Sequence, residues 1–183
     1  ELPTEPAECF SPCGAGAVIR RDVFKAHGGF DERFFCFCED VDLGYRMRLA
    51  GERCVFLPDA IIRHAGGGLS GRVSEFSLFH GARNRLWTYV KNTPLRLLIL
   101  TLPVHIALTA AILFRGLFTG RFGGTWRGFW AGLKGLGPFI ADRRRLKKRR
   151  HVSLSDLTSA MCWNPLTMLA RKADLKPMKR DKR

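Results

Sequence analysis

Residues Leu97–Phe114 contain no Asp, Glu, Lys or Arg, so either the rest of the protein or a membrane must cover them. An α-helix of this length would rise about 27 Å, which is at the lower edge of what spans a bilayer. Pro103 and His105 interrupt the stretch and favour a re-entrant or interfacial arrangement over a straight crossing. The sequence therefore predicts a membrane-associated segment here and leaves open whether that segment crosses the bilayer.

The charge of the chain changes just before this stretch. Acidic and basic residues balance over residues 1–92, so residues 93–183 carry the whole net charge of +15. The basic residues are densest at 143–150, where only Leu146 interrupts the Lys and Arg side chains. Because this run follows apolar and aromatic segments, anionic membrane lipid is the favoured partner, with about 1 kcal/mol gained per cation. A nucleic-acid partner is not expected, since no recognisable nucleic-acid-binding domain accompanies the run.

Residues 116–137 are rich in glycine and carry two regular stripes. The first stripe consists of glycines at every fourth position: Gly116, Gly120, Gly124, Gly128 and Gly132. The second consists of aromatic residues at the same spacing: Phe118, Phe122, Trp126 and Trp130. On a helix the two stripes occupy opposite sides. Glycine costs about 1 kcal/mol relative to Ala inside a helix, so a helix here needs a membrane or a packing partner. A glycine-rich loop is the alternative interpretation.

The first half of the chain alternates strand-like and helical patterns. Residues 1–8 are polar, contain two prolines and are expected to be a linker. Strands are expected at 14–20, 53–57 and 60–64. Helices are expected at 21–27, from residue 39 as far as a C-terminal Gly51, and at 75–92. This alternation predicts an α/β layer with a thin sheet, consistent with half a domain.

Few residues of this half have the chemistry of an active site. Glu39, Asp40 and Asp42 lie at the expected start of one helix, and His64 lies at the end of the last expected strand. A structural role is also open for the acids, because carboxylates at a helix N-terminus bind free backbone N–H groups and complement the helix dipole. The glycine run at 66–68 resembles a phosphate-binding loop only weakly, since it lacks the Lys-Ser/Thr of such loops.

Several motifs of the first half follow one another in the order found in a known enzyme family. They occupy Gly14–Phe24, Gly28–Phe35, Glu39–Arg46, Leu57–His64 and Arg83–Pro94. Together they resemble the C-terminal half of the catalytic domain of glycosyltransferase family 2. The greatest similarity is to the rhamnosyl- and galactofuranosyltransferases that act on lipid-linked polysaccharide.

The resemblance implies a partial GT-A fold with a mixed, Rossmann-like sheet, followed by a helical membrane-associated region. It also implies an inverting transfer from a nucleotide-sugar donor to a lipid-linked or polysaccharide acceptor. The resemblance implies that Asp40 is the general base and that Glu39 and Asp42 bind substrate. It also implies that His64 is a ligand of a divalent cation (Mn²⁺ or Mg²⁺). These roles suit the chemistry, because inversion needs a carboxylate to take the acceptor proton, and a cation neutralises the departing diphosphate.

One motif of the family is missing. No Asp-x-Asp, which holds the metal and nucleotide in the family, occurs before Glu39. The chain is therefore expected to be the acceptor-side half of a transferase and to be inactive alone. The expected domains are this half at 1–94, membrane-associated helices at 95–142 and a basic tail at 143–183.

The expected setting is cell-envelope glycan synthesis at the cytoplasmic face of the plasma (inner) membrane, because basic segments stay on that side. The alternative is a non-enzymatic module that binds the membrane surface. It is motivated by the aromatic stripe and the basic run, and transfer activity would distinguish the two.

Overall fold

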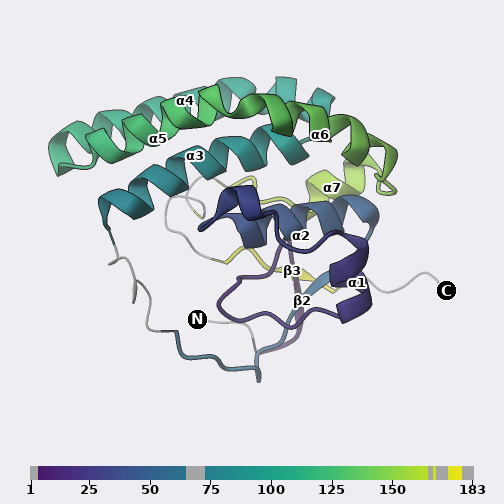
Figure 1. Ribbon diagram of the computed structural model, residues 1–183. Helices are drawn as coiled ribbons and strands as arrows, with labels where there is room; N and C mark the ends of the chain where they lie inside the picture. The colour runs from purple at the N-terminus through teal and green to yellow at the C-terminus, as the bar shows by residue number, and fades with distance from the viewer. Residues whose placement is uncertain (1–3, 65–72, 165–166, 168–172, 179–183) are drawn as a thin grey trace.

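A computed structural model describes residues 4–64, 73–164, 167 and 173–178 of the chain. The helices are α1 (Arg21–Ala26), α2 (Glu39–Ala50), α3 (Glu75–Asn92), α4 (Leu95–Thr119), α5 (Phe122–Lys134), α6 (Leu136–Lys148) and α7 (Leu154–Ala160), with a 3₁₀ helix η1 (Glu32–Phe34). The strands are β1 (Ala7–Cys9), β2 (Cys54–Phe56) and β3 (Lys176–Pro177). Figure 1 shows α3 to α6 gathered on one side of the molecule, with α2 lying between them and the small sheet.

Among the described residues the sheet is small and antiparallel. The mixed, Rossmann-like sheet predicted from the sequence does not form there. The observed strand order is β2-β1-β3, and β1 begins at Ala7, inside the expected linker. β2 confirms the strand expected at 53–57. The strands expected at 14–20 and 60–64 do not form. Glycines in the first stretch and the Pro58-Asp59 turn before the second weaken strand pairing, and the apolar side chains of both stretches remain largely exposed.

The helices of the first half lie where the sequence predicts them. α2 begins at Glu39, and the next residue after the helix, Gly51, has a φ of 100°, in the left-handed region that glycine favours. α3 covers the predicted residues 75–92 and begins with reciprocal hydrogen bonds between Ser74 and Ser77. These boundaries are predictable because each depends on a capping residue next to it in the sequence.

α4 extends the apolar stretch in both directions and contains Pro103 within the helix. By length and composition alone it could cross a membrane, with a mean hydropathy of 2.4, and only 11% of its most apolar window is buried. Its most exposed large apolar side chains are Leu95, Ile99, Leu100, Val104, Phe114 and Phe118. A helix that is apolar on all sides is normally covered, so the outer side of α4 requires a further apolar environment.

The glycine stripe packs on α3. Gly124, Gly128 and Gly132 are buried, and a Cβ atom on Gly128 would lie 2.2 Å from the carbonyl oxygen of Phe79. The indole Nε1 of Trp87 donates a hydrogen bond of 2.9 Å to the carbonyl oxygen of Gly132. The residues are therefore helical with α3 as packing partner, and the glycine-rich loop interpretation is wrong for Phe122–Lys134. The aromatic stripe of α5 lies on the other side, with Trp126 and Trp130 exposed, whereas Phe118 belongs to α4, which ends at Thr119.

Alanine at this contact should separate the two helices. We expect Gly128→Ala to lower the free energy of unfolding by about 1–3 kcal/mol, because the added Cβ meets the backbone of Phe79. The matched control is Gly123→Ala on the same helix, where a Cβ meets nothing within 4 Å. It should stabilise the protein by up to about 1 kcal/mol through helix propensity. Urea denaturation followed by circular dichroism measures both, and equal effects would contradict the packing described.

Two buried clusters join the helical layer to the first half of the chain. One contains Phe34, Trp87 and Phe139, and the rings of Trp87 and Phe139 stack with centroids 4.5 Å apart. The other contains Tyr45, Leu49, Leu97 and Leu157. Because these side chains come from η1, α2, α3, α4, α6 and α7, the acidic helix α2 and the helical layer form one packed unit.

Candidate functional site

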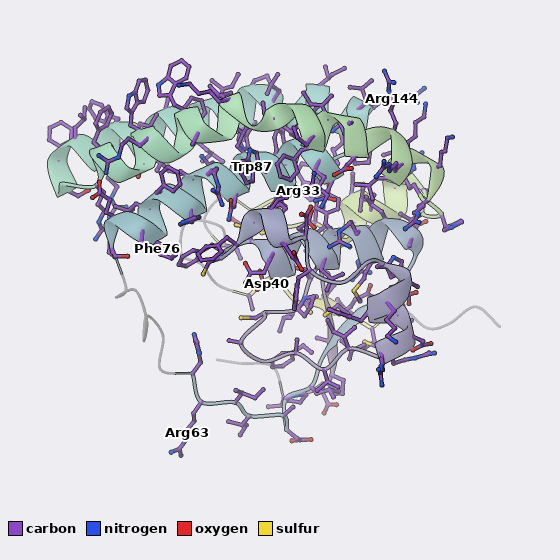
Figure 2. The ribbon with its side chains drawn as sticks, in the orientation of Figure 1. Arg33, Asp40, Arg63, Phe76, Trp87 and Arg144 are labelled. Carbon is purple, nitrogen blue, oxygen red and sulfur yellow. The ribbon has the colours of Figure 1, made fainter. Side chains whose placement is uncertain are left out.

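Asp40 lies in the first turn of α2, beside the loop that precedes α1 (Figure 2). Its Oδ2 accepts a hydrogen bond of 2.7 Å from the backbone N–H of Gly14, and its Oδ1 accepts one of 2.7 Å from Val41. Asp40 also borders an open pocket of about 270 Å³, whose apolar lining includes Phe24 and Phe30. The two backbone donors fix the orientation of the carboxylate at the edge of a space that a ligand can enter.

Glu39 has a carboxylate oxygen that the protein leaves unpaired. Its Oε2 is buried and has no hydrogen-bond partner within the described ranges. An unpaired buried carboxylate oxygen is costly, and such an atom in a folded protein calls for a donor. A hydroxyl group of a bound ligand is a donor of the right kind.

The approach to α2 is strained. Three residues just before the helix have positive φ values, although none of them is a glycine. The φ values are 62° at Phe35, 70° at Phe37 and 65° at Cys38. Each such residue costs on the order of 1–3 kcal/mol. The fully buried Asn84 compensates, because its Nδ2 lies 2.7–2.9 Å from three carbonyl oxygens, those of Phe34, Cys36 and Phe37. The sequence marks Asn84 only as part of the motif Arg83–Pro94 and gives no sign of these contacts.

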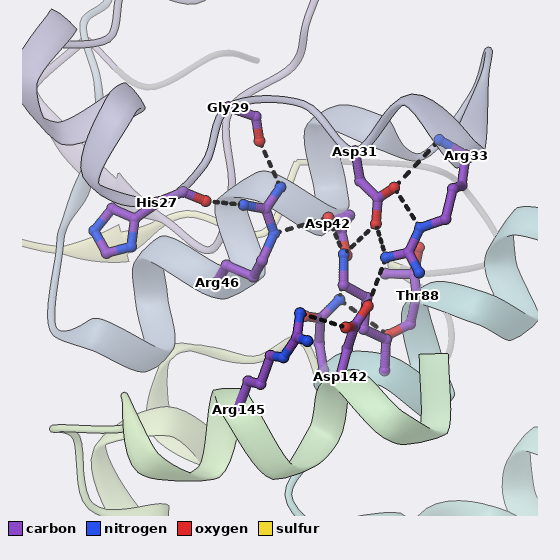
Figure 3. A network of polar contacts seen from close by, with 11 residues as sticks. His27, Gly29, Asp31, Arg33, Asp42, Arg46, Thr88, Asp142 and Arg145 are labelled. Atoms are coloured by element: carbon purple, nitrogen blue, oxygen red, sulfur yellow. Dashed lines mark hydrogen bonds and ion pairs between the residues drawn. The ribbon is translucent and has the colours of Figure 1, made fainter. Parts of the chain in front are cut away.

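Asp42 is fully buried and does not line the pocket beside Asp40. Its carboxylate accepts hydrogen bonds from Lys91 at 2.8 Å, Arg46 at 2.9 Å and Asn92 at 2.8 Å (Figure 3). These donors come from α2 itself and from the end of α3. The geometry favours a role in holding α2 against α3, and contact of Asp42 with substrate stays a prediction.

The polar contacts of Asp42 continue into a network that reaches α6 (Figure 3). Lys91 also donates to Asp31 at 2.8 Å, and Arg33 joins Asp31 to Asp142 of α6 with contacts of 2.5 Å to each. Burial raises the pKa of Asp31, but the hydrogen bonds from Arg33 and Lys91 outweigh burial and hold it well below its usual range. The motifs in the sequence contain Asp31 and Lys91, but only the structure shows that they connect α2, α3 and α6.

His64 is exposed and lies outside any helix or strand. Figure 2 shows its neighbour Arg63 well apart from Asp40, so the structure does not bring the predicted metal ligand to the acidic cluster. Within residues 4–64, 73–164, 167 and 173–178, no three His, Cys, Asp or Glu side chains group closely enough to bind a metal ion. The glycine run at 66–68 lies outside the described residues. The described residues thus do not form a site for Mn²⁺ or Mg²⁺, and the role of His64 stays a prediction.

Comparison with known proteins shows what the first half of the chain is similar to. The family described as "Glycosyltransferase like family 2" matches residues 7–91. Over 59 residues the sequence is 44% identical to N-acetylglucosaminyl-diphospho-decaprenol L-rhamnosyltransferase of Mycobacterium tuberculosis, a match that covers 32% of this chain and 19% of that protein. Over 45 residues, 25% of this chain, it is 40% identical to rhamnosyltransferase WbbL of Escherichia coli, of which 17% is covered.

A third relative is the O-antigen biosynthesis protein RfbC of Myxococcus xanthus, 47% identical over 45 residues, which are 25% of this chain and 4% of that protein. No solved structure matches the chain. The matches thus span at most 19% of each of these relatives. Residues 7–91 are therefore similar to glycosyltransferase family 2 and, among the relatives named above, to rhamnosyltransferases.

Proposed function

We propose that the chain provides the acceptor side of an inverting glycosyltransferase that acts in cell-envelope glycan synthesis. The donor is a nucleotide sugar, and the acceptor is lipid-linked or a polysaccharide. The observation that carries this proposal is the pair of carboxylates at the start of α2, with Asp40 oriented by two backbone N–H groups and Glu39 presenting an unpaired oxygen. The names of two relatives support rhamnose as the transferred sugar, and one of these names includes a diphospho-decaprenol.

In the proposed reaction Asp40 is the general base. It takes the proton of the acceptor hydroxyl while the hydroxyl oxygen bonds to C1 of the sugar and the bond from C1 to the diphosphate breaks. Glu39 orients the acceptor by accepting a hydrogen bond from a second hydroxyl at Oε2. The buried contacts of Asp42 support a role in positioning α2, and with it both carboxylates. A divalent cation with His64 as a ligand remains part of the proposal, and no step is assigned to it.

A transfer assay tests the proposal directly. The full-length protein that carries this segment is incubated with nucleotide-activated rhamnose and a sugar linked to a polyprenyl diphosphate. We expect a lipid-extractable product in which the anomeric configuration of the donor is inverted. Failure of the folded protein to transfer from any of a panel of nucleotide sugars would contradict an enzymatic role and would favour the non-enzymatic membrane-binding module.

We also place the chain at the cytoplasmic face of the plasma (inner) membrane, with anionic lipids as partners. The exposed apolar side of α4 and the exposed basic residues of α6 support this location. Binding to phosphatidylglycerol vesicles should weaken at least about tenfold between 0.1 M and 1 M salt, because salt screens the basic residues. A residual binding from α4 should survive high salt.

Vesicles of neutral phosphatidylcholine are the control for this salt dependence, and their binding should change little with salt. Vesicle co-sedimentation measures both. Equal affinity for duplex DNA and for anionic vesicles at physiological salt would contradict the expectation that nucleic acid is not a partner.

A further inference from the structure

A second pocket, of about 590 Å³, lies where the end of α3 and the start of α4 meet α6. We call it the basic pocket, because its lining contains six basic residues and no acidic residue: Lys91, Arg96, Arg143, Arg144, Lys147 and Arg150.

Most of the positive charge in the basic pocket is not neutralised by the protein. Lys91 is paired with Asp31 and Asp42, and Arg143 donates to the carbonyl oxygen of Val90. The other four, Arg96, Arg144, Lys147 and Arg150, are exposed and make no ion pair with an acid of the described chain. Several Arg and Lys side chains around one space are suited to a compact ligand with more than one negative charge, such as a diphosphate.

The basic pocket is continuous with an apolar surface. Leu95 lines the pocket and is also the first residue of α4. From it, exposed apolar side chains continue along one side of the helix at spacings of three and four residues: Leu95, Ile99, Leu102 and Ile106. A ligand that matches both surfaces has a diphosphate at one end and a long hydrocarbon chain attached to it.

The basic pocket also has a definite relation to Asp40. Leu49, near the end of α2, lines the basic pocket, whereas Asp40 borders the other pocket at the start of the same helix. Nine residues of helix separate them, which is about 14 Å along the axis. This is the scale of a sugar joined to a diphosphate. Lys91 lines the basic pocket and also contacts Asp42, which is two residues after Asp40 on α2.

We propose that the basic pocket binds the diphosphate of a lipid-linked acceptor, whose polyprenyl chain lies along the Leu95–Ile106 side of α4. This inference rests on the proposed function, since it assigns a binding site to the acceptor. Two other sources offer a similar head group, an anionic phospholipid and a free diphosphate, and the experiment separates them from the acceptor lipid.

The test compares two double charge reversals in the full chain. Arg144→Glu/Lys147→Glu changes the basic pocket, and Lys148→Glu/Arg149→Glu changes the net charge equally at neighbouring residues that do not line it. The probe is a neutral phosphatidylcholine vesicle that contains a small fraction of a long-chain polyprenyl diphosphate. We expect the pocket variant to bind at least tenfold more weakly than the unchanged chain and the control variant to bind within threefold of it. If the pocket variant does not fold by circular dichroism, Arg96→Gln/Arg150→Gln replaces it.

Three outcomes would overturn the proposal. Equal loss in both double variants would show that only general charge matters. Equal binding of the unchanged chain to phosphatidylglycerol vesicles of the same charge would indicate an anionic phospholipid site. Inorganic pyrophosphate bound as tightly as the vesicles would indicate a site for free diphosphate. Because the readout is binding, it is independent of transfer, and an Asp40→Asn variant should bind the polyprenyl diphosphate normally even when it transfers no sugar.

Discussion

The Asp40→Asn substitution is expected to lower kcat for sugar transfer by about 10²–10⁴-fold, the contribution typical of a general base. An amide has nearly the same shape as the carboxylate, but it cannot accept the acceptor proton. It retains one oxygen for the backbone N–H of Gly14 or Val41, so the start of α2 should remain folded. Single-turnover transfer by the full-length protein measures the chemical step, and binding of the nucleotide sugar should be unchanged.

Two further variants sharpen this test. Asp59→Asn removes an exposed carboxylate from a turn and should leave transfer unchanged. Glu39→Gln should raise KM for the acceptor more than it lowers kcat, because Glu39 is proposed to orient the acceptor and not to take its proton. Normal turnover by Asp40→Asn would remove Asp40 from the reaction and leave it as a residue that caps α2.

The largest effect on stability is expected for Asp42→Ala. The substitution removes three hydrogen bonds from a fully buried carboxylate and leaves the charges of Arg46 and Lys91 without this partner. Breaking a buried ion pair in this way costs about 3–5 kcal/mol. That is a large fraction of the 5–15 kcal/mol by which a typical domain is stable. Urea denaturation should show a clear loss of free energy of unfolding.

The control for Asp42→Ala is Asp22→Ala, which removes the exposed partner of Arg20 and should leave the unfolding midpoint almost unchanged. Equal effects of the two substitutions would contradict the structural importance of the buried network. The Asp42→Asn variant tests the remaining prediction of substrate contact. If Asp42 only positions α2, its effect on transfer should follow the loss of stability, whereas a separate rise in KM for the acceptor would indicate direct contact.

The sequence predicts the helices of the first half well because their boundaries depend on nearby residues. Gly51 caps the end of α2 and Ser74 caps the start of α3, each through hydrogen bonds to residues within a few positions in the sequence. The acidic pair at the start of α2 is found for the same reason. The sequence also indicates that a helix in the glycine-rich segment would need a membrane or a packing partner, and only the structure identifies α3 as that partner.

The sheet and the buried network could not be predicted in this way. β1 pairs with β3, which is almost the whole chain away, and a two-residue strand leaves no periodic pattern. The residues with positive φ before α2 are not glycines, so the sequence does not reveal their conformation. Asn84 from α3 compensates for their strain by binding carbonyl groups of this segment. In both cases the stabilising partner is distant in the sequence, so local propensity gives no signal.

The contact between Gly128 and the backbone of Phe79 has a consequence for the choice of acceptor. Since the two backbones touch, α5 cannot approach α3 further, and no long side chain at this point can change its rotamer to alter the spacing. With α4 on the membrane, as proposed, a rigid contact between α5 and α3 would help to keep Asp40 at a constant height above the lipid surface. In the proposed transferase, an acceptor would then be selected by whether its length brings a hydroxyl to that height.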